Sequence, residues 1–283
     1  MKYKEQLPHP SLQDHVKCFW IMEREYTAEH PAEVVTPDAF IELIVNLGTP
    51  YVLQAEGAPD REMPRVILVG LQSKPLIFRC EGSVKLVVTR FYAWGALPFL
   101  ADRAWGLNKL SATLAREWED LATRIEPSVR EGDYDSAVAI VEDHLIERLL
   151  TATVDLKKIQ SAAKLLYLQK GQFRAAELAE HCNLSSRQLQ RQFQDVVGVS
   201  AKTLARSIRF EEVRKRLMFD PDQNLTALAY EQGYADQAHF IHDFKEFANR
   251  TPGEFAREMH SIQAIFRDRE NVVFLQAPSS NHR

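Results

Sequence analysis

The stretch from Phe173 to Phe193 constrains the fold of this chain most, because its pattern predicts two short helices joined by a tight turn. The first helix has small apolar residues at helical spacing, namely Ala176, Leu178 and Ala179. Asn183 tolerates the left-handed conformation that ends a helix, and Ser185 is a favourable N-cap for the next one. Leu189 and Phe193 then lie four residues apart on one face of the second helix. Together these signals predict a helical hairpin with a small apolar core.

The opposite face of the second helix carries long side chains rich in hydrogen-bond donors. Arg187, Gln190, Arg191 and Gln194 recur at i, i+3, i+4 and i+7, with Ser186 beside them at the start of the helix. Such a face suits a recognition helix, which offers Arg and Gln to base edges and phosphates. We therefore predict that these five residues contact DNA. On this stretch alone, a structural hairpin with a solvated polar face is an equally good interpretation.

A second stretch of the same kind favours DNA binding. Residues 200–219 form one long predicted helix, which Asp220-Pro221-Asp222 ends. Residues 225–247 then repeat the pattern, with Gly233 at the turn and Asp236 placed to cap the next helix. That helix turns Phe side chains inward and leaves three polar side chains outside, which are Gln237, His239 and His242. A helix of 20 residues spans about 30 Å, close to the ~34 Å between successive major-groove faces of B-DNA, so the long helix can hold both recognition helices on one face of a duplex.

The N-terminal half follows a different pattern. Between Leu12 and Trp94, short runs rich in Val, Ile and aromatic residues alternate with Gly, Pro and Asp, which predicts the strands of a sandwich or closed barrel. From Gly95 the pattern becomes helical, around 95–105 and 114–125. Tyr134 to Leu150 is a clear amphipathic helix, which either covers the β-rich body or forms the interface of a homodimer.

The predicted fold class is therefore α+β. A β-rich, cupin-like barrel or sandwich with flanking helices occupies 1–150, and 151–157 is a linker. Residues 158–260 form an all-α domain in which a long helix joins two helix-turn-helix units. Residues 261–283 are a tail, and the apolar run 271–276 predicts a strand. We expect it to pair with a sheet edge of the N-terminal domain, since an exposed apolar strand favours aggregation; a frayed apolar tail is the alternative.

Charge is divided unevenly along the chain. The net charge is −4, yet residues 157–260 carry 16 Lys and Arg against 13 Asp and Glu, while residues 1–156 carry 16 against 24. The basic part is the one suited to phosphate contacts. The N-terminus lacks the apolar core of a signal peptide and no run has the length of a membrane span, so we expect a cytoplasmic protein without a membrane partner.

Residues 158–257 resemble the DNA-binding domain of the AraC/XylS family of bacterial transcription regulators. The resemblance rests on AAELAEHCNLSSRQLQRQF, GVSAKTLARSIRFEEVRKRL and LAYEQGYADQAHFIHDFKEF with TPGEF. It implies seven helices and groove-facing residues at Arg187, Gln190, Arg191, Gln237, His239 and His242. The N-terminal half resembles a branch with an uncharacterised sensor domain, through PDAFIELIVNLG, LVGLQ and RFYAWGALPFL. This chain departs from the family pattern in having His242 for Arg, Ala201 for Pro and Asn249 for Gly.

The resemblance implies a small-molecule effector, and the N-terminal half contains residues that suit its pocket. Aromatic walls with one carboxylate to orient a ligand are typical of such sites. The candidates are Trp20, Glu42, Phe91, Tyr92 and Trp94. These aromatic residues are equally well explained as the core of a barrel, and the sequence leaves both interpretations open.

The sequence contains none of the motifs GxSxG, GxxxxGK[ST], HExxH or a strand followed by GxGxxG, so we expect neither an enzyme nor a cofactor. The cysteines Cys18, Cys80 and Cys182 are too scattered for a disulfide framework or a zinc knuckle. His239 and His242 lie three apart with no third metal ligand evident, so we expect no metal. We predict a transcription regulator that responds to a small-molecule effector and binds promoter DNA. If it activates transcription, we expect it to contact RNA polymerase as well. The alternative is a catalytic N-terminal barrel fused to a DNA-binding module.

Overall fold

The structure is a computed structural model of the chain, and it describes all residues except 55–58, 101–109, 112–115, 154–155 and 268–283. The chain forms two compact units, Met1–Glu211 and Glu212–Arg283. The division falls inside the long helix, whereas the sequence analysis placed a linker at 151–157. The predicted strand at 271–276 lies outside the described residues. No described helix is both long and apolar enough to cross a membrane.

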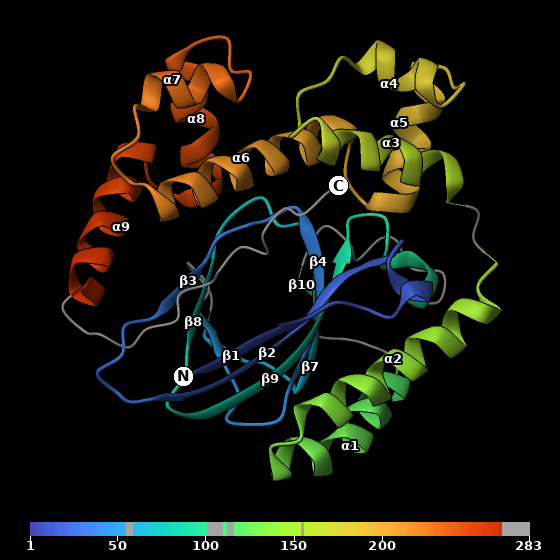
Figure 1. The fold of residues 1–283 in the computed structure, drawn as a ribbon, viewed down its shortest axis with the longest axis vertical. Helices are drawn as coiled ribbons and strands as arrows, with labels where there is room; N and C mark the ends of the chain where they lie inside the picture. The colour runs from blue at the N-terminus through green and yellow to red at the C-terminus, as the bar shows by residue number, and fades with distance from the viewer. Residues whose placement is uncertain (55–58, 101–109, 112–115, 154–155, 268–283) are drawn as a thin grey trace. The chain divides into compact units, whose positions relative to one another are not determined.

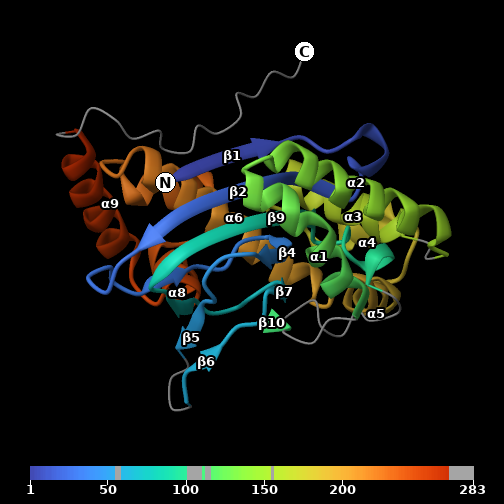
Figure 2. The same ribbon diagram turned by 90° about the horizontal axis from the view of Figure 1, so that it is seen from below.

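The β-rich body of the first unit contains two antiparallel sheets, which confirms the predicted fold class. The larger sheet has the strand order β1-β2-β9-β4-β7-β10, and Figure 2 shows these strands side by side. Its strands are β1 (Lys2–Gln6), β2 (Val16–Tyr26), β4 (Phe40–Asn46), β7 (Val66–Val69), β9 (Gly82–Tyr92) and β10 (Leu110–Ser111). The smaller sheet runs β3-β8-β5-β6, with β3 (Glu33–Val35), β5 (Val52–Gln54), β6 (Arg61–Glu62) and β8 (Leu76–Arg79).

The two faces of the larger sheet serve different cores, because successive side chains of a strand point to opposite sides. Along β9, Val87 and Phe91 belong to a cluster shared with helices. Val84 and Val88 belong to another cluster, which includes Trp20 and Ile44. Ile44 also packs with Phe78 of β8, so this second face looks toward the smaller sheet. Because β9 places apolar side chains on both faces, with Lys85 and Arg90 among them, its sequence shows no simple alternation of apolar and polar residues.

Helices α1 (Arg116–Glu131) and α2 (Tyr134–Thr151) pack together (Figure 1) and cover the first face of the larger sheet. The side chain of Asp133 caps α2 by accepting from Ser136 N at 3.1 Å. The apolar stripe predicted for Tyr134–Leu150 is buried in this core, with Ala137 and Leu145 fully covered. This stripe therefore has its partner within the chain. Of the helix predicted at 95–105, the described residues contain one 3-10 turn, Leu97–Phe99.

The remaining helices of the first unit are α3 (Lys157–Leu168), α4 (Ala175–His181), α5 (Ser186–Val197) and the first part of α6 (Ala201–Phe219). The second unit contains the end of α6, α7 (Leu225–Glu231), α8 (Gln237–Ala248) and α9 (Pro252–Arg267). These are the seven helices that the resemblance implied. Helix α9 continues beyond residue 260, where the predicted domain ended.

Candidate nucleic-acid interface

The turn between α4 and α5 is fixed by local hydrogen bonds around Asn183 and Ser185, the two residues that the sequence analysis expected to end one helix and cap the next. Asn183 adopts the left-handed conformation with φ 52°, and Leu184 N donates to Ala179 O at 2.9 Å. Ser185 then forms a capping box with Gln188: Gln188 N donates to Ser185 Oγ at 3.3 Å, and Ser185 N donates to Gln188 Oε1 at 2.9 Å. These bonds set the direction of α5 relative to α4.

Helix α5 is divided into a buried and an exposed face. Leu189 and Phe193 are buried at 4% and 0% exposure. The five predicted DNA contacts are all exposed, namely Ser186, Arg187, Gln190, Arg191 and Gln194. Gln194 also donates its side-chain amide to Gly198 O at 2.6 Å, which stabilises the end of the helix. Within the described residues no carboxylate pairs with Arg187 or Arg191, so both guanidinium groups are available to a ligand.

The second unit repeats this construction. The turn passes through Gly233 at φ 74°, and Asp236 caps α8 by accepting from His239 N at 2.7 Å. The side chains of Phe240, Phe244 and Phe247 are buried. The three predicted contacts on the other side of α8 are exposed, namely Gln237, His239 and His242. Asn249 ends the helix at φ 58°, as expected for a residue that stands in for Gly.

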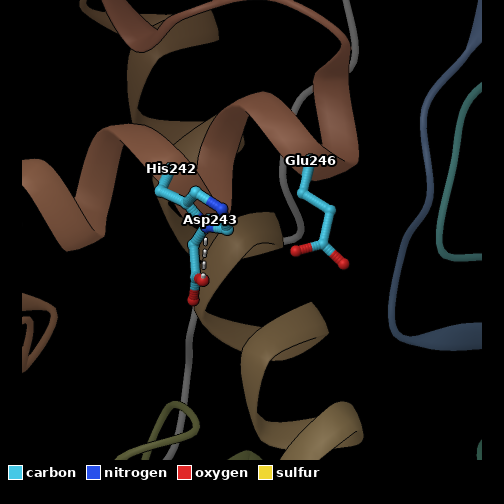
Figure 3. Close-up of side chains that lie close together, drawn as sticks. All are labelled: His242, Asp243 and Glu246. Atoms are coloured by element: carbon cyan, nitrogen blue, oxygen red, sulfur yellow. Dashed lines mark ion pairs between the residues drawn. The ribbon is translucent and has the colours of Figure 1, made fainter.

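Asp243, which the sequence analysis did not single out, lies beneath both histidines. Its carboxylate is 3.7 Å from His239 Nε2 and 4.0 Å from His242 Nδ1, while its side chain is only 4% exposed. Figure 3 shows His242 and Asp243 close together, with Glu246 projecting from the next turn of α8. A buried carboxylate in this place limits the orientations that the exposed imidazoles adopt. Asp243 stands four residues after His239, and this i, i+4 spacing was the signal in the sequence that could have identified the pair.

His242, Asp243 and Glu246 also bring possible metal-ligand atoms within 4.8 Å of one another. The sequence analysis found no third ligand beside the histidines, and the structure supplies two carboxylates. All three residues come from consecutive turns of one helix, however, whereas tetrahedral zinc needs ligands on several sides. Asp243 also has a further interaction partner.

The five candidate pocket residues of the N-terminal half do not form one group. Trp20 and Glu42 meet on the face toward the smaller sheet, where Trp20 Nε1 donates to Glu42 Oε1 at 2.9 Å. Phe91 lies in the core on the opposite face of the sheet. Tyr92 stacks on Trp94 with 4.7 Å between ring centroids, near α3 rather than near Glu42. Phe91 and Trp94 are each 1% exposed, so these two residues belong to the core of the β-rich body rather than to an open pocket.

Arg90 and Asp38, which the sequence analysis missed, complete a charged group around Glu42. Arg90 Nη2 lies 2.7 Å from Glu42 Oε1 and 3.5 Å from Asp38 Oδ2. The pKa of Asp38 is raised to about 7, chiefly by burial and also by the charges of Glu42 and Glu211, while Arg90 opposes the shift. Burial lowers the pKa of Arg90, but Glu42 and Asp38 outweigh it and hold that pKa above its usual value.

A surface pocket of about 350 Å³ lies elsewhere on the β-rich body, beside α1. It contains none of the five candidate residues. Its lining mixes charged, polar and apolar residues and consists of Leu47, Gly48, Thr49, Ser83, Lys85, Glu126, Val129 and Arg130.

Comparison with known protein families finds one match in each half of the chain. Residues 178–258 match a family described as a helix-turn-helix domain, and residues 4–110 match a domain of unknown function, DUF6597. An uncharacterized HTH-type transcriptional regulator of Staphylococcus aureus (strain MSSA476) is 26% identical over 107 residues. The match covers 35% of this chain and only 14% of that protein, so the chain spans a small part of the relative's length.

Two solved structures are also similar. ToxT from Vibrio cholerae is 13% identical, with a TM-score of 0.50 over 84% of this chain and 98% of that chain, which shows a common fold. A Chromobacterium violaceum transcriptional regulator with an AraC-type DNA-binding domain is 20% identical over 36% of this chain and 92% of that chain, with a TM-score of 0.34. From its two helix-turn-helix units and its two matching domains, the chain carries an AraC-type helix-turn-helix domain that follows an N-terminal DUF6597 domain.

Proposed function

We propose that this protein is a sequence-specific DNA-binding transcription regulator whose N-terminal domain responds to a small molecule. The observation that carries the proposal is the repeated helix-turn-helix, in which each second helix buries an apolar face and exposes a polar one. Its matched family supports the same conclusion. The proposed DNA contacts are Ser186, Arg187, Gln190, Arg191 and Gln194 on α5, and Gln237, His239 and His242 on α8.

Arg187 and Arg191 are the principal readers in this proposal. An exposed guanidinium without a carboxylate partner can donate two hydrogen bonds to guanine O6 and N7, or bind phosphate. Gln190 between them suits adenine, which it can contact through N6 and N7. On α8 the imidazoles of His239 and His242 offer fewer donors, and Asp243 limits their orientation. The first unit should therefore contribute more of the base discrimination than the second.

For the effector, the charged group at Trp20, Glu42 and Arg90 is the proposed polar anchor. A catalytic barrel is the rival function, since a buried carboxyl with a pKa near 7 is also what an active site needs. Arg90 is already paired with both neighbouring carboxylates, and the group does not line the surface pocket. These features favour a regulator. RNA polymerase and a second copy of the chain remain proposed partners.

The test is to select bound duplexes from a random DNA library with the purified full chain and to sequence them. A regulator yields a recurring motif with two parts about one helical turn apart. Arg187→Ala should weaken selection of that motif, while Arg130→Ala, which removes another exposed Arg far along the chain on α1, should leave it unchanged. A library recovered without any motif would contradict the proposal.

A further inference from the structure

The larger sheet is covered unequally on its two faces. On the face toward the helices, Phe19 and Ile21 of β2 are 0% and 2% exposed. On the opposite face of the same strand, Trp20 and Met22 are only partly buried. Because neighbouring residues of one strand differ in this way, the sheet has one closed face and one open face, the second being the face that carries Trp20 and Met22.

Strands β4 and β9 continue the open face. Glu42 and Ile44 of β4 are partly exposed, whereas Leu43 between them is buried. Val88 of β9 is paired with Ile44 on one side and with Trp20 on the other, and it is fully buried. Trp20 and Ile44 therefore flank a floor formed by Val88. The smaller sheet covers the open face in part, through contacts such as those with Ile44.

The polar end of the open face is formed by Glu42 and Arg90, which are direct partners in the register of β4 with β9. Trp20 Nε1 at 2.9 Å, Arg90 Nε at 2.8 Å and Arg90 Nη2 at 2.7 Å all approach the same oxygen, Glu42 Oε1. A bidentate pair of arginine and carboxylate would use both carboxylate oxygens. Here both guanidinium nitrogens share one oxygen, so Glu42 Oε2 lies outside the pairing and can accept a hydrogen bond from a ligand.

The charges at this end favour a cationic ligand. Arg90 also lies 3.5 Å from Asp38 Oδ2, so one guanidinium serves two carboxylates. Glu5 of β1 is paired with Trp20 in the register of β1 with β2, which places a further carboxylate on the same face. Since Arg90 is already engaged with two carboxylates, it is a poor partner for an anion, and the surrounding carboxylates repel one.

Trp20 and Tyr3 form an aromatic wall beside these carboxylates. Their ring centroids are 6.0 Å apart, and the Tyr3 hydroxyl donates to Glu5 Oε1 at 2.6 Å. Burial raises the pKa of Tyr3, and Glu5 raises it further while Arg90 lowers it, so both charges lie near this ring. Aromatic rings next to carboxylates suit an organic ammonium group, because both attract the cation.

We propose that the open face of the larger sheet binds a small organic monocation with an apolar, aromatic body. The ammonium group donates to Glu42 Oε2, and the body lies over Val88 between Trp20 and Ile44. This site names the class of effector for the proposed regulator, so its influence on DNA binding rests on that proposed function, whereas the binding itself does not.

The experiment is isothermal titration calorimetry of the full chain with three probes of similar size, which are phenethylammonium, the neutral phenethyl alcohol and the anion phenylacetate. The ammonium should bind about tenfold more tightly than the alcohol, since a hydrogen bond to a charged group contributes roughly that factor. Phenylacetate should bind more weakly than the alcohol, because its carboxylate would meet those of Glu42 and Asp38.

Glu42→Gln removes the charge and keeps the size of the side chain. It should weaken ammonium binding about tenfold and leave the affinity for the alcohol unchanged, which also shows that the variant is folded. It should strengthen phenylacetate binding, since Arg90 loses its nearer partner. Glu126→Gln is the matched control, because Glu126 is another partly exposed carboxylate that pairs with an arginine, Arg130, and it lies in the surface pocket. This variant should change none of the three affinities.

Equal affinity for the ammonium and the alcohol would overturn the inference, and so would the absence of measurable ammonium binding. Ammonium binding that depends on Glu126 rather than on Glu42 would overturn it as well, since the cation would then occupy the surface pocket. A chain that binds the ammonium as expected but selects no DNA motif would count against the proposed function alone.

Discussion

Replacing Gly171 by Ala should destabilise the first unit by more than a change of one methyl group suggests. Gly171 follows α3 at φ 76°, in the left-handed region that disfavours side chains. A Cβ built there would lie 2.3 Å from Ala205 O and 2.9 Å from Arg209 Cγ, so α3 and α6 would have to separate. The left-handed conformation costs about 1–2 kcal/mol, and overpacking of this kind costs about 1–3 kcal/mol. We therefore expect a loss of roughly 2–5 kcal/mol in unfolding free energy.

Gly132, in the turn between α1 and α2, is the matched control. Its φ is 79°, nearly that of Gly171, but a Cβ there would meet no atom within 4 Å. Gly132→Ala should thus lose only the conformational part, about 1–2 kcal/mol. Both variants can be measured by urea denaturation followed by far-ultraviolet circular dichroism. If the two substitutions shifted the urea midpoint equally, the close approach of α3 and α6 at Gly171 would not matter energetically, and the reasoning would fail.

Three further predictions concern single side chains. Arg187→Ala should reduce affinity for the selected DNA by about 1–3 kcal/mol and relax preference at one base, whereas Arg206→Ala should at most weaken all sequences evenly; competition binding with variant duplexes measures both. Ser185→Ala, which removes the capping-box oxygen, should lower stability by about 0.5–2 kcal/mol in thermal or urea unfolding, and a value near zero would refute the cap. Trp94→Phe keeps an aromatic ring but leaves Asp14 O without its indole donor, so it should cost about 1–3 kcal/mol in the same assay.

Local signals predicted the helix-turn-helix units well. Asn183, Ser185, Gly233 and Asp236 act within a few residues of themselves, so their roles as turn and cap residues could be inferred from the sequence and are confirmed. The long helix at 200–219 was also correct to within one residue. Strand β1 escaped prediction because Lys2–Gln6 is polar and largely exposed, and its place in the sheet comes from pairing with β2.

The candidate pocket was harder to predict, since it depends on contacts between distant residues. Strand β9 has apolar residues on both faces, so no simple alternation distinguishes the face that contains Phe91 from the face toward Glu42. The group formed by Arg90, Glu42 and Asp38 depends on the pairing of β4 with β9, 48 residues apart at the Arg90–Glu42 hydrogen bond. No local pattern marks such a pairing. Asp243 was missed for another reason: a charged residue on a helix is ordinarily exposed.

Among the described residues, one hydrophobic cluster runs without a break from Leu12 in the β-rich body to Ile208 in α6. Burial of this kind makes the elements that share it melt together, as one cooperative folding unit. The first helix-turn-helix should therefore resist local unfolding as strongly as the sheet does. The second lies in the separate unit Glu212–Arg283 and should unfold locally without the first. A fragment that begins at residue 158 would cut through this cluster and expose Ile159, Leu166 and Tyr167 to water. The first helix-turn-helix unit therefore shares its core with the β-rich body, and without that body it would lack part of the apolar surface that buries it.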